Sequence, residues 1–224
     1  MALSPICIQP HNPISRVVGY GGGMQPALRP SPSSSFDELY KQLQSLPEGM
    51  TGQIIDGQLY AMTRPFSPHA TAHTRLVMAL AAIDGEPGDG HPGGWRVHLE
   101  PEIHLVLPEQ THAVVPDLAA WRISRLTAFP KTGYLQLSPD WVCEVLSEGT
   151  ASLDVGPKRR LYHRAGVEWL WFIDPIKHTL EAQRQVGDVW VRVGMWQDQD
   201  RARIEPFPEI EINIGRLWEG VEAS

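Results

Sequence analysis

The chain has few cysteines, no excess of positive charge and no long apolar run. Only two of its 224 residues are cysteines, Cys7 and Cys143, which excludes a disulfide framework and favours a reducing cytoplasm. The formal net charge of −7 excludes a general attraction to nucleic acid, so such binding would need a local basic patch. No apolar run is long enough to span a membrane, and the N-terminus lacks the basic and apolar stretches of a signal peptide. We therefore expect a globular cytoplasmic protein without a membrane partner.

Residues 1–35 differ in composition from the rest of the chain. They include six prolines, a run of three glycines and no acidic residue. Such a segment cannot bury enough apolar surface to offset its ordering entropy, so we expect a flexible tail, with Met24 as an alternative start. The remainder is long enough for one substantial domain, expected over residues 36–218, with a loose end at 219–224.

Helical and strand patterns alternate along this domain. Asp56-Gly57 lies between two strand-like runs and predicts a hairpin. Apolar spacing predicts helices over 36–46, 69–83 and 152–166, the last with Asp154 as its N-cap. Strands are expected over 95–107, 113–123, 140–147 and 169–175, followed by a hairpin over 179–193. This order predicts a mixed α/β fold, in which helices flank a central mixed sheet in the order αβββαβ, with additional β-hairpins.

Two Pro-Asp pairs lie beside apolar runs, in VVPDLAAW and SPDWVCEVLS. Asp140 lies at the start of its run, where a turn residue is expected, whereas Asp117 and Glu144 lie inside runs. A buried carboxylate is costly unless it is paired or binds a metal. Asp140 and Glu144 are about 13 Å apart along one strand, but Asp117 and Glu144 can converge if their strands pair. Converging carboxylates suit Mg²⁺ or Mn²⁺; the alternative is that either one ends its strand and faces solvent or an arginine.

The helix over 152–166 adds a cation to this pair. Helical spacing places Val155, Lys158, Leu161 and Tyr162 on one apolar face and the arginines on the other. An inward lysine can stabilise a phosphate or orient water, although a lysine in the first turn can also snorkel to solvent. On that view Lys158→Met would keep the apolar stem and change folding little. The basic outer face is either an ordinary solvated face or a set of phosphate contacts.

These motifs together carry a family resemblance. The chain resembles the Uma-type putative restriction endonuclease family of the PD-(D/E)XK nuclease superfamily over roughly residues 36–215. The resemblance implies a restriction-endonuclease-like core. The motifs that carry it are VVPDLAAW with Asp117, Glu144 to Ser147, Asp154 with Lys158 and Tyr162, Gly166-Val167 with Trp171, and Asp174-Pro175.

The resemblance implies a metal-dependent endonuclease that hydrolyses phosphodiester bonds, most often in DNA. Asp117 and Glu144 would be catalytic and would hold Mg²⁺ or Mn²⁺, and Lys158 would stabilise the transition state. The sequence departs from the superfamily pattern at Leu146, where a strand lysine is usual, so the lysine would have migrated to the helix. A homodimer is compatible with such an enzyme, but the sequence shows no dimer face. The alternative is a catalytically inactive nuclease fold that binds nucleic acid or protein.

Other residues are weaker candidates. His69 and His73 have the spacing of a helical metal pair but lack the Glu of the H-E-x-x-H motif, which argues against zinc. The resemblance places His73 near the site. Glu100 could supply a further carboxylate or lie on the strand surface, and Tyr162 is more typical of the core than of catalysis.

Overall fold

The structure is a computed structural model that describes residues 35–63 and 67–220. Most of the expected tail, and residues 221–224 of the expected loose end, therefore lie outside the described residues. The helical elements are α1 (Phe36–Gln44), α2 (Ser67–Leu80), η1 (Ala81–Ile83), α3 (Ala151–Leu153), η2 (Asp154–Lys158), α4 (Arg159–Arg164) and η3 (Ile214–Trp218). The strands are β1 (Met50–Ile55), β2 (Gln58–Thr63), β3 (Trp95–Leu99), β4 (Ile103–Val106), β5 (Thr111–Val114), β6 (Leu118–Arg122), β7 (Trp141–Val145), β8 (Trp169–Asp174), β9 (Thr179–Val186), β10 (Val189–Gln197), β11 (Arg201–Ile204) and β12 (Phe207–Asn213).

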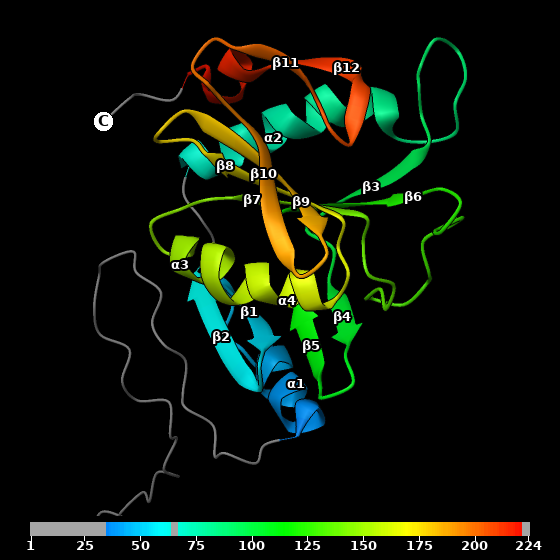
Figure 1. Cartoon of the computed structure of the whole chain (residues 1–224). Coiled ribbons are helices and arrows are strands. Elements are labelled where there is room, and N and C mark those ends of the chain that lie inside the picture. The colour runs from blue at the N-terminus through cyan, green and yellow to red at the C-terminus, as the bar shows by residue number, and fades with distance from the viewer. Residues whose placement is uncertain (1–34, 64–66, 221–224) are drawn as a thin grey trace, which may run out of the picture.

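A six-stranded sheet forms the centre of the molecule, in the order β10-β9-β8-β7-β6-β3. It is mixed, because β7 and β8 are parallel while β6 and β7 are antiparallel. A four-stranded sheet has the order β2-β1-β5-β4, and β11 and β12 form a hairpin. In Figure 1, α2 and the β11–β12 hairpin lie on one side of the central strands, and α3 and α4 lie on the other, with the four-stranded sheet and α1 beyond them. The predicted fold class is confirmed.

Local sequence signals fix the first elements. Ser35 caps α1, because its hydroxyl accepts the Glu38 N–H while the Glu38 carboxylate accepts the Ser35 N–H. The turn between β1 and β2 has positive φ at Asp56 (49°) and Gly57 (70°), which is the conformation that an Asp-Gly hairpin favours. The hairpin expected there is present, and so is the later one between β9 and β10.

The expected strands over 95–107 and 113–123 are each two strands, so that part of the prediction was wrong. The first breaks at Glu100, which has a φ of 44°, and the second breaks at Pro116, which has no N–H to donate to a ladder. As a result β3 pairs with β6 in the central sheet, whereas β4 pairs with β5 in the four-stranded sheet. The Glu100 N–H donates to the Asp117 carbonyl at 2.9 Å, so the two breaks meet. Asp117 therefore lies at a corner between the sheets.

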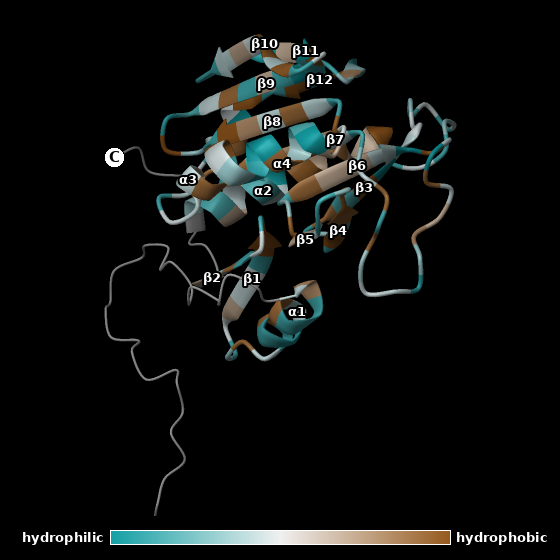
Figure 2. Ribbon diagram, turned by 60° about the horizontal axis from the view of Figure 1, so that its bottom comes forward, coloured by the Kyte–Doolittle hydropathy of each residue, from teal (hydrophilic) through white to brown (hydrophobic). Residues whose placement is uncertain are grey.

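The two faces of β7 serve different layers. Trp141, Cys143 and Val145 pack in the hydrophobic cluster that includes α2 residues, whereas Val142 packs in the cluster that includes α4 residues. Because side chains alternate along a strand, Glu144 points to the α4 side. Figure 2 shows both hydrophilic and hydrophobic segments on α4, as expected for a helix with one buried face.

Candidate active site

Asp117 and Glu144 lie across one antiparallel strand pair. In the β6–β7 register Leu118 is opposite Cys143, so the next position places Asp117 opposite Glu144. The Val145 N–H donates to Asp117 Oδ2 at 2.7 Å, so the aspartate side chain joins the end of the ladder. The strand pairing on which the expected convergence of the two carboxylates depends is therefore present.

Two histidines of α2 hold Asp117 from the opposite layer. His69 Nε2 lies 3.1 Å from Asp117 Oδ1, and His73 Nε2 lies 2.9 Å from the Asp117 backbone oxygen. Both imidazoles are buried, whereas the Asp117 side chain is 17% exposed. Asp117 is thus the member of this group that meets solvent, and one of its carboxylate oxygens faces an imidazole.

Lys158 and Glu144 form a buried ion pair. Lys158 Nζ lies 2.7 Å from Glu144 Oε1 and 3.1 Å from Asp154 Oδ1, and it donates to the Val115 carbonyl at 3.4 Å. The Tyr162 hydroxyl donates to Glu144 Oε1 at 2.6 Å. None of the three charged groups is more than 3% exposed. The prediction that Lys158 points inward is confirmed, and the alternative of a snorkelling lysine is excluded.

A π-helical segment places Lys158. The helix begins at Ala151, not at Asp154, and the Arg159 N–H donates to the Asp154 carbonyl five residues back within η2. Asp154 is therefore a buried partner of Lys158, and the prediction that it is an N-cap was wrong. The wider turn also changes the helical phase, so Val155 is 47% exposed although regular α-helical spacing placed it on the buried face.

Burial and charge shift the acid–base equilibria of this cluster. Burial raises the pKa of Glu144 to about 8, because the nearby Lys158 only partly offsets the loss of hydration. Burial also opposes ionisation of Asp117, but its pKa is lowered because His69, Lys158 and the Val145 N–H stabilise the carboxylate. Although burial opposes it, Glu144 and then Asp154 raise the pKa of Lys158. Within this cluster, burial therefore favours the protonated form of Glu144 and the neighbouring cations favour the ionised form of Asp117.

Asp140 lies at the other end of the β6–β7 ladder and is more than the turn residue expected from the sequence. It is 4% exposed and pairs with Arg122 at 2.6 Å and with Arg125 at 2.8 Å. The Arg122 N–H also donates to its carboxylate at 2.9 Å. Asp140 therefore has a structural role, holding Arg122 and Arg125 at the end of the β6–β7 ladder that is remote from Asp117.

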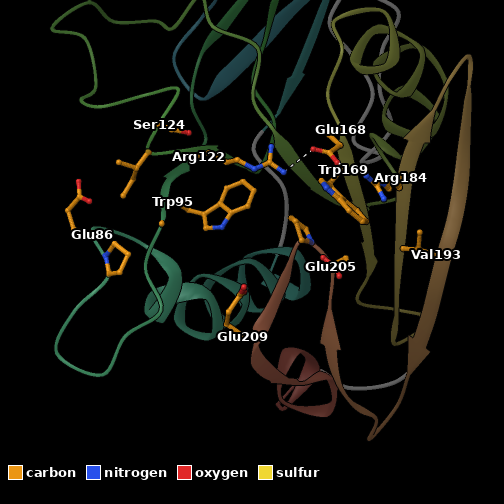
Figure 3. Close-up of a pocket in the computed structure, with 14 residues that line it drawn as sticks. Glu86, Trp95, Arg122, Ser124, Glu168, Trp169, Arg184, Val193, Glu205 and Glu209 are labelled. Carbon is orange, nitrogen blue, oxygen red and sulfur yellow. Dashed lines mark hydrogen bonds and ion pairs between the residues drawn. The ribbon is translucent and has the colours of Figure 1, made fainter.

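A hollow of about 810 Å³ adjoins this far end of the ladder (Figure 3). Two tryptophans in its wall each lie under an arginine at 5.1 Å, Trp95 under Arg122 and Trp169 under Arg184. Glu168 bridges the two arginines at 2.9 and 3.1 Å. The tryptophans are buried and the two arginines are paired, and no histidine or lysine is among the residues that line the hollow, so it lacks the imidazoles and the lysine gathered around Asp117.

The remaining candidates lie outside the buried cluster. Glu100 is exposed and contacts Asp117 through its backbone N–H. On the outer face of α4, Arg164 pairs with Asp56 and Glu109, which neutralises part of the basic surface expected there. Arg160 is exposed and has no ion pair within residues 35–63 and 67–220. In the described part of the chain, no helix combines the length and apolar character needed to cross a bilayer.

Two parts of the site were missed by sequence reasoning. Asp117 completes a group of three possible metal ligands with His69 and His73. It comes from a different layer of the fold, so no local sequence motif contains all three residues. Asp154 was misjudged because an aspartate before a helical run commonly caps a helix. Its spacing of four residues from Lys158 was the available signal, since side chains at that spacing meet on one helical face.

The mixed sheet, the acidic pair at the end of the β6–β7 ladder and the lysine from the adjoining helix define a restriction-endonuclease-like α/β protein. The structure matches the crystal structure of a "putative nuclease belonging to DUF820" from Anabaena variabilis, with a TM-score of 0.64 and 22% sequence identity over 84% of this chain and 98% of that chain. The Uma2 family, described as "Putative restriction endonuclease", matches residues 37–215, and the chain belongs to this family. The resemblance seen in the sequence is thereby confirmed. No curated protein matches the chain.

Proposed function

We propose that this protein is a metal-dependent endonuclease that hydrolyses phosphodiester bonds in DNA. The observation that carries the proposal is the buried contact of Lys158 with Glu144, next to Asp117 at the end of the β6–β7 ladder. A lysine and two carboxylates at such burial are costly for folding, and groups of this kind are concentrated at functional sites. Membership of the Uma2 family supports the same activity.

The donor atoms around Asp117 fit a divalent cation. Asp117 Oδ2 is engaged by the Val145 N–H, while Oδ1 faces His69 and the side chain reaches solvent. Asp117 would hold Mg²⁺ or Mn²⁺ together with Glu144, whose carboxylate becomes available when its proton leaves. The bound ion would supply Lewis acidity and a water of lowered pKa.

The protein groups have separate roles in this proposal. Lys158 presents a fixed positive charge that stabilises negative charge on the phosphorus oxygens in the transition state. Asp154 and Tyr162 are positioning residues, because Asp154 holds Lys158 and the Tyr162 hydroxyl orients Glu144. Lys158→Arg retains the charge but replaces a compact ammonium by a planar fork, so cleavage should fall by about 10²-fold or more.

A cleavage assay tests the proposal. The full chain is incubated with supercoiled plasmid, single-stranded DNA and RNA in Mg²⁺, in Mn²⁺ and in EDTA. We expect metal-dependent cutting of DNA that is lost in Asp117→Ala and retained in Asp140→Asn, provided that the latter remains folded. Binding of DNA without cutting in either metal would instead support an inactive nucleic-acid-binding fold, and preferential cutting of RNA would contradict the DNA assignment.

A homodimer would supply one site for each strand of a duplex, so we include it in the proposal. Light scattering during size-exclusion chromatography measures the mass directly. A mass near twice 25.0 kDa supports the dimer, and a mass near 25.0 kDa at the concentration used for cleavage contradicts it.

A further inference from the structure

We propose that His69 and His73 are metal ligands beside Asp117, and that the site consequently prefers a first-row transition-metal ion, such as Mn²⁺, Co²⁺ or Zn²⁺, over Mg²⁺. This inference rests on the proposed function, in which the carboxylates alone would suit Mg²⁺. Each of the three residues offers one ligand atom, and these atoms lie within 4.8 Å of one another. Imidazole nitrogens favour transition metals, whereas Mg²⁺ favours oxygen ligands.

The arrangement of the histidines fits a shared ion. His69 and His73 are four residues apart on α2, so they lie on the same face one turn apart, with ring centroids 5.9 Å from each other. His69 Nε2 and Asp117 Oδ1 are already 3.1 Å apart. Around an ion with bonds of about 2.1 Å, neighbouring ligand atoms are about 3.0–3.4 Å apart. Small side-chain shifts, together with loss of the proton that His69 Nε2 shares with the Asp117 carboxylate, would thus complete the group.

The backbone contact of His73 supports the same role. The Asp117 carbonyl can only accept a hydrogen bond, so the His73 Nε2 at 2.9 Å must carry the proton. The other ring nitrogen then keeps its lone pair. Imidazoles that bind metals commonly donate their second N–H to a carbonyl or carboxylate in this way, which fixes the tautomer and the ring orientation.

Metal titrations separate ligands from mere neighbours. The full chain is stripped of metal by a chelator and titrated calorimetrically with Co²⁺ and, separately, with Mg²⁺, in the wild type and in His69→Gln and His73→Gln. The matched control is His91→Gln, because His91 is exposed in a loop and its backbone pairs with Gly88. Circular dichroism establishes that each variant is folded.

We expect the wild type to bind Co²⁺ at least about 100-fold more tightly than Mg²⁺. Each site variant should lose more Co²⁺ affinity than the roughly 10- to 100-fold that removal of an outer-shell partner costs, and should lose much less for Mg²⁺. The Co²⁺/Mg²⁺ selectivity should therefore fall at least tenfold, and His91→Gln should keep it. Equal losses for both ions, or no loss, would overturn the inference, because the histidines would then only support Asp117.

A second measurement uses the wild type alone, in case a variant does not fold. Paramagnetic Co²⁺ should strongly shift the NMR signals of two imidazoles. Binding of Co²⁺ that leaves all imidazole signals unshifted would overturn the inference.

The outcomes of the metal titrations are distinguishable from those of the cleavage assay. If the histidine variants lose Co²⁺/Mg²⁺ selectivity but the wild type cleaves no DNA in any metal, the histidine ligands are supported and the nuclease function is rejected. If the wild type cleaves DNA but the histidine variants keep their Co²⁺/Mg²⁺ selectivity, the nuclease function is supported and the histidine ligands are rejected.

Discussion

Replacing Lys158 by Met should destabilise the fold strongly. The sequence alone suggested that folding would change little, because methionine keeps the apolar stem. The structure reverses this expectation, since Lys158 is 2% exposed and is the only ion-pair partner of Asp154 within the described residues. Removing one member of a buried ion pair leaves an uncompensated charge and typically costs about 3–5 kcal/mol.

The magnitude can be worked out from the cluster. Burial raises the pKa of Glu144 to about 8, which favours its protonated form at pH 7. Without Lys158, Asp154 must either remain charged without a partner or also take a proton. Its ordinary pKa is 3.8, so protonation at pH 7 costs up to about 4.4 kcal/mol, at about 1.36 kcal/mol for each pH unit between 3.8 and 7. We therefore expect a loss of about 3–4 kcal/mol in the free energy of unfolding.

The same reasoning fixes the sign of the pH dependence. In Lys158→Met, burial holds the folded-state pKa of Asp154 above its unfolded value of 3.8. Between these two pKa values the folded state binds more protons than the unfolded state, so the free energy of unfolding falls as pH rises through that range. Relative to the wild type, the loss should be small near pH 4 and larger at pH 7.

Urea unfolding followed by tryptophan fluorescence measures the effect at pH 4 and pH 7. The double variant Lys158→Met/Asp154→Asn should recover most of the loss at pH 7, because it removes the unpaired acid. Arg160→Met is the matched control on the same helix and should change stability by less than about 0.5 kcal/mol. A loss below about 1 kcal/mol for Lys158→Met at pH 7, or a loss that is equal at both pH values, would refute the reasoning.

Three further predictions concern individual contacts. Tyr162→Phe removes the hydroxyl that donates to Glu144 and should lower the free energy of unfolding by about 1–2 kcal/mol in urea denaturation; an unchanged value would contradict the contact. Asp117→Asn should weaken Mn²⁺ binding severely in calorimetry, whereas Asp140→Asn should leave it nearly unchanged and instead reduce thermal stability; equal losses of affinity would contradict the assignment. Val155→Gln should change stability by no more than about 0.5 kcal/mol, and a loss above about 2 kcal/mol would argue against the π-helical phase.

Periodicity in the sequence was enough to identify most of the buried cluster. Near-continuous apolar runs placed Asp117 and Glu144 on or beside buried strands, and the spacing between paired strands brought them together. Helical periodicity directed Lys158 inward. The strand inference succeeds because it depends on the side-chain alternation that a regular strand imposes, and β7 is regular. Lys158 is the last residue of the π-helical segment η2 and is nevertheless buried, as are Leu161 and Tyr162 of α4.

The parts that could not be predicted lie where the backbone departs from regular geometry. The π-helical segment turned Val155 outward, and a positive φ at Glu100 divided a strand that reads as continuous. The contact of His69 with Asp117 joins α2 to the end of β6 across layers, and such long-range proximity leaves no trace in a single local pattern.

The two ends of the β6–β7 ladder carry separate groups of buried charged side chains. The carboxylate–imidazole–lysine cluster lies around Asp117, and the arginine network lies around Asp140, about 13 Å away along four positions of the ladder. Substitutions separated by more than about 7–10 Å without shared partners usually have additive effects. Changes around the hollow at Arg122 should therefore alter the stability of the protein without altering the metal preference that we propose for the site at Asp117. Substitutions can therefore accumulate at one end of this short ladder without changing the effect of substitutions at the other.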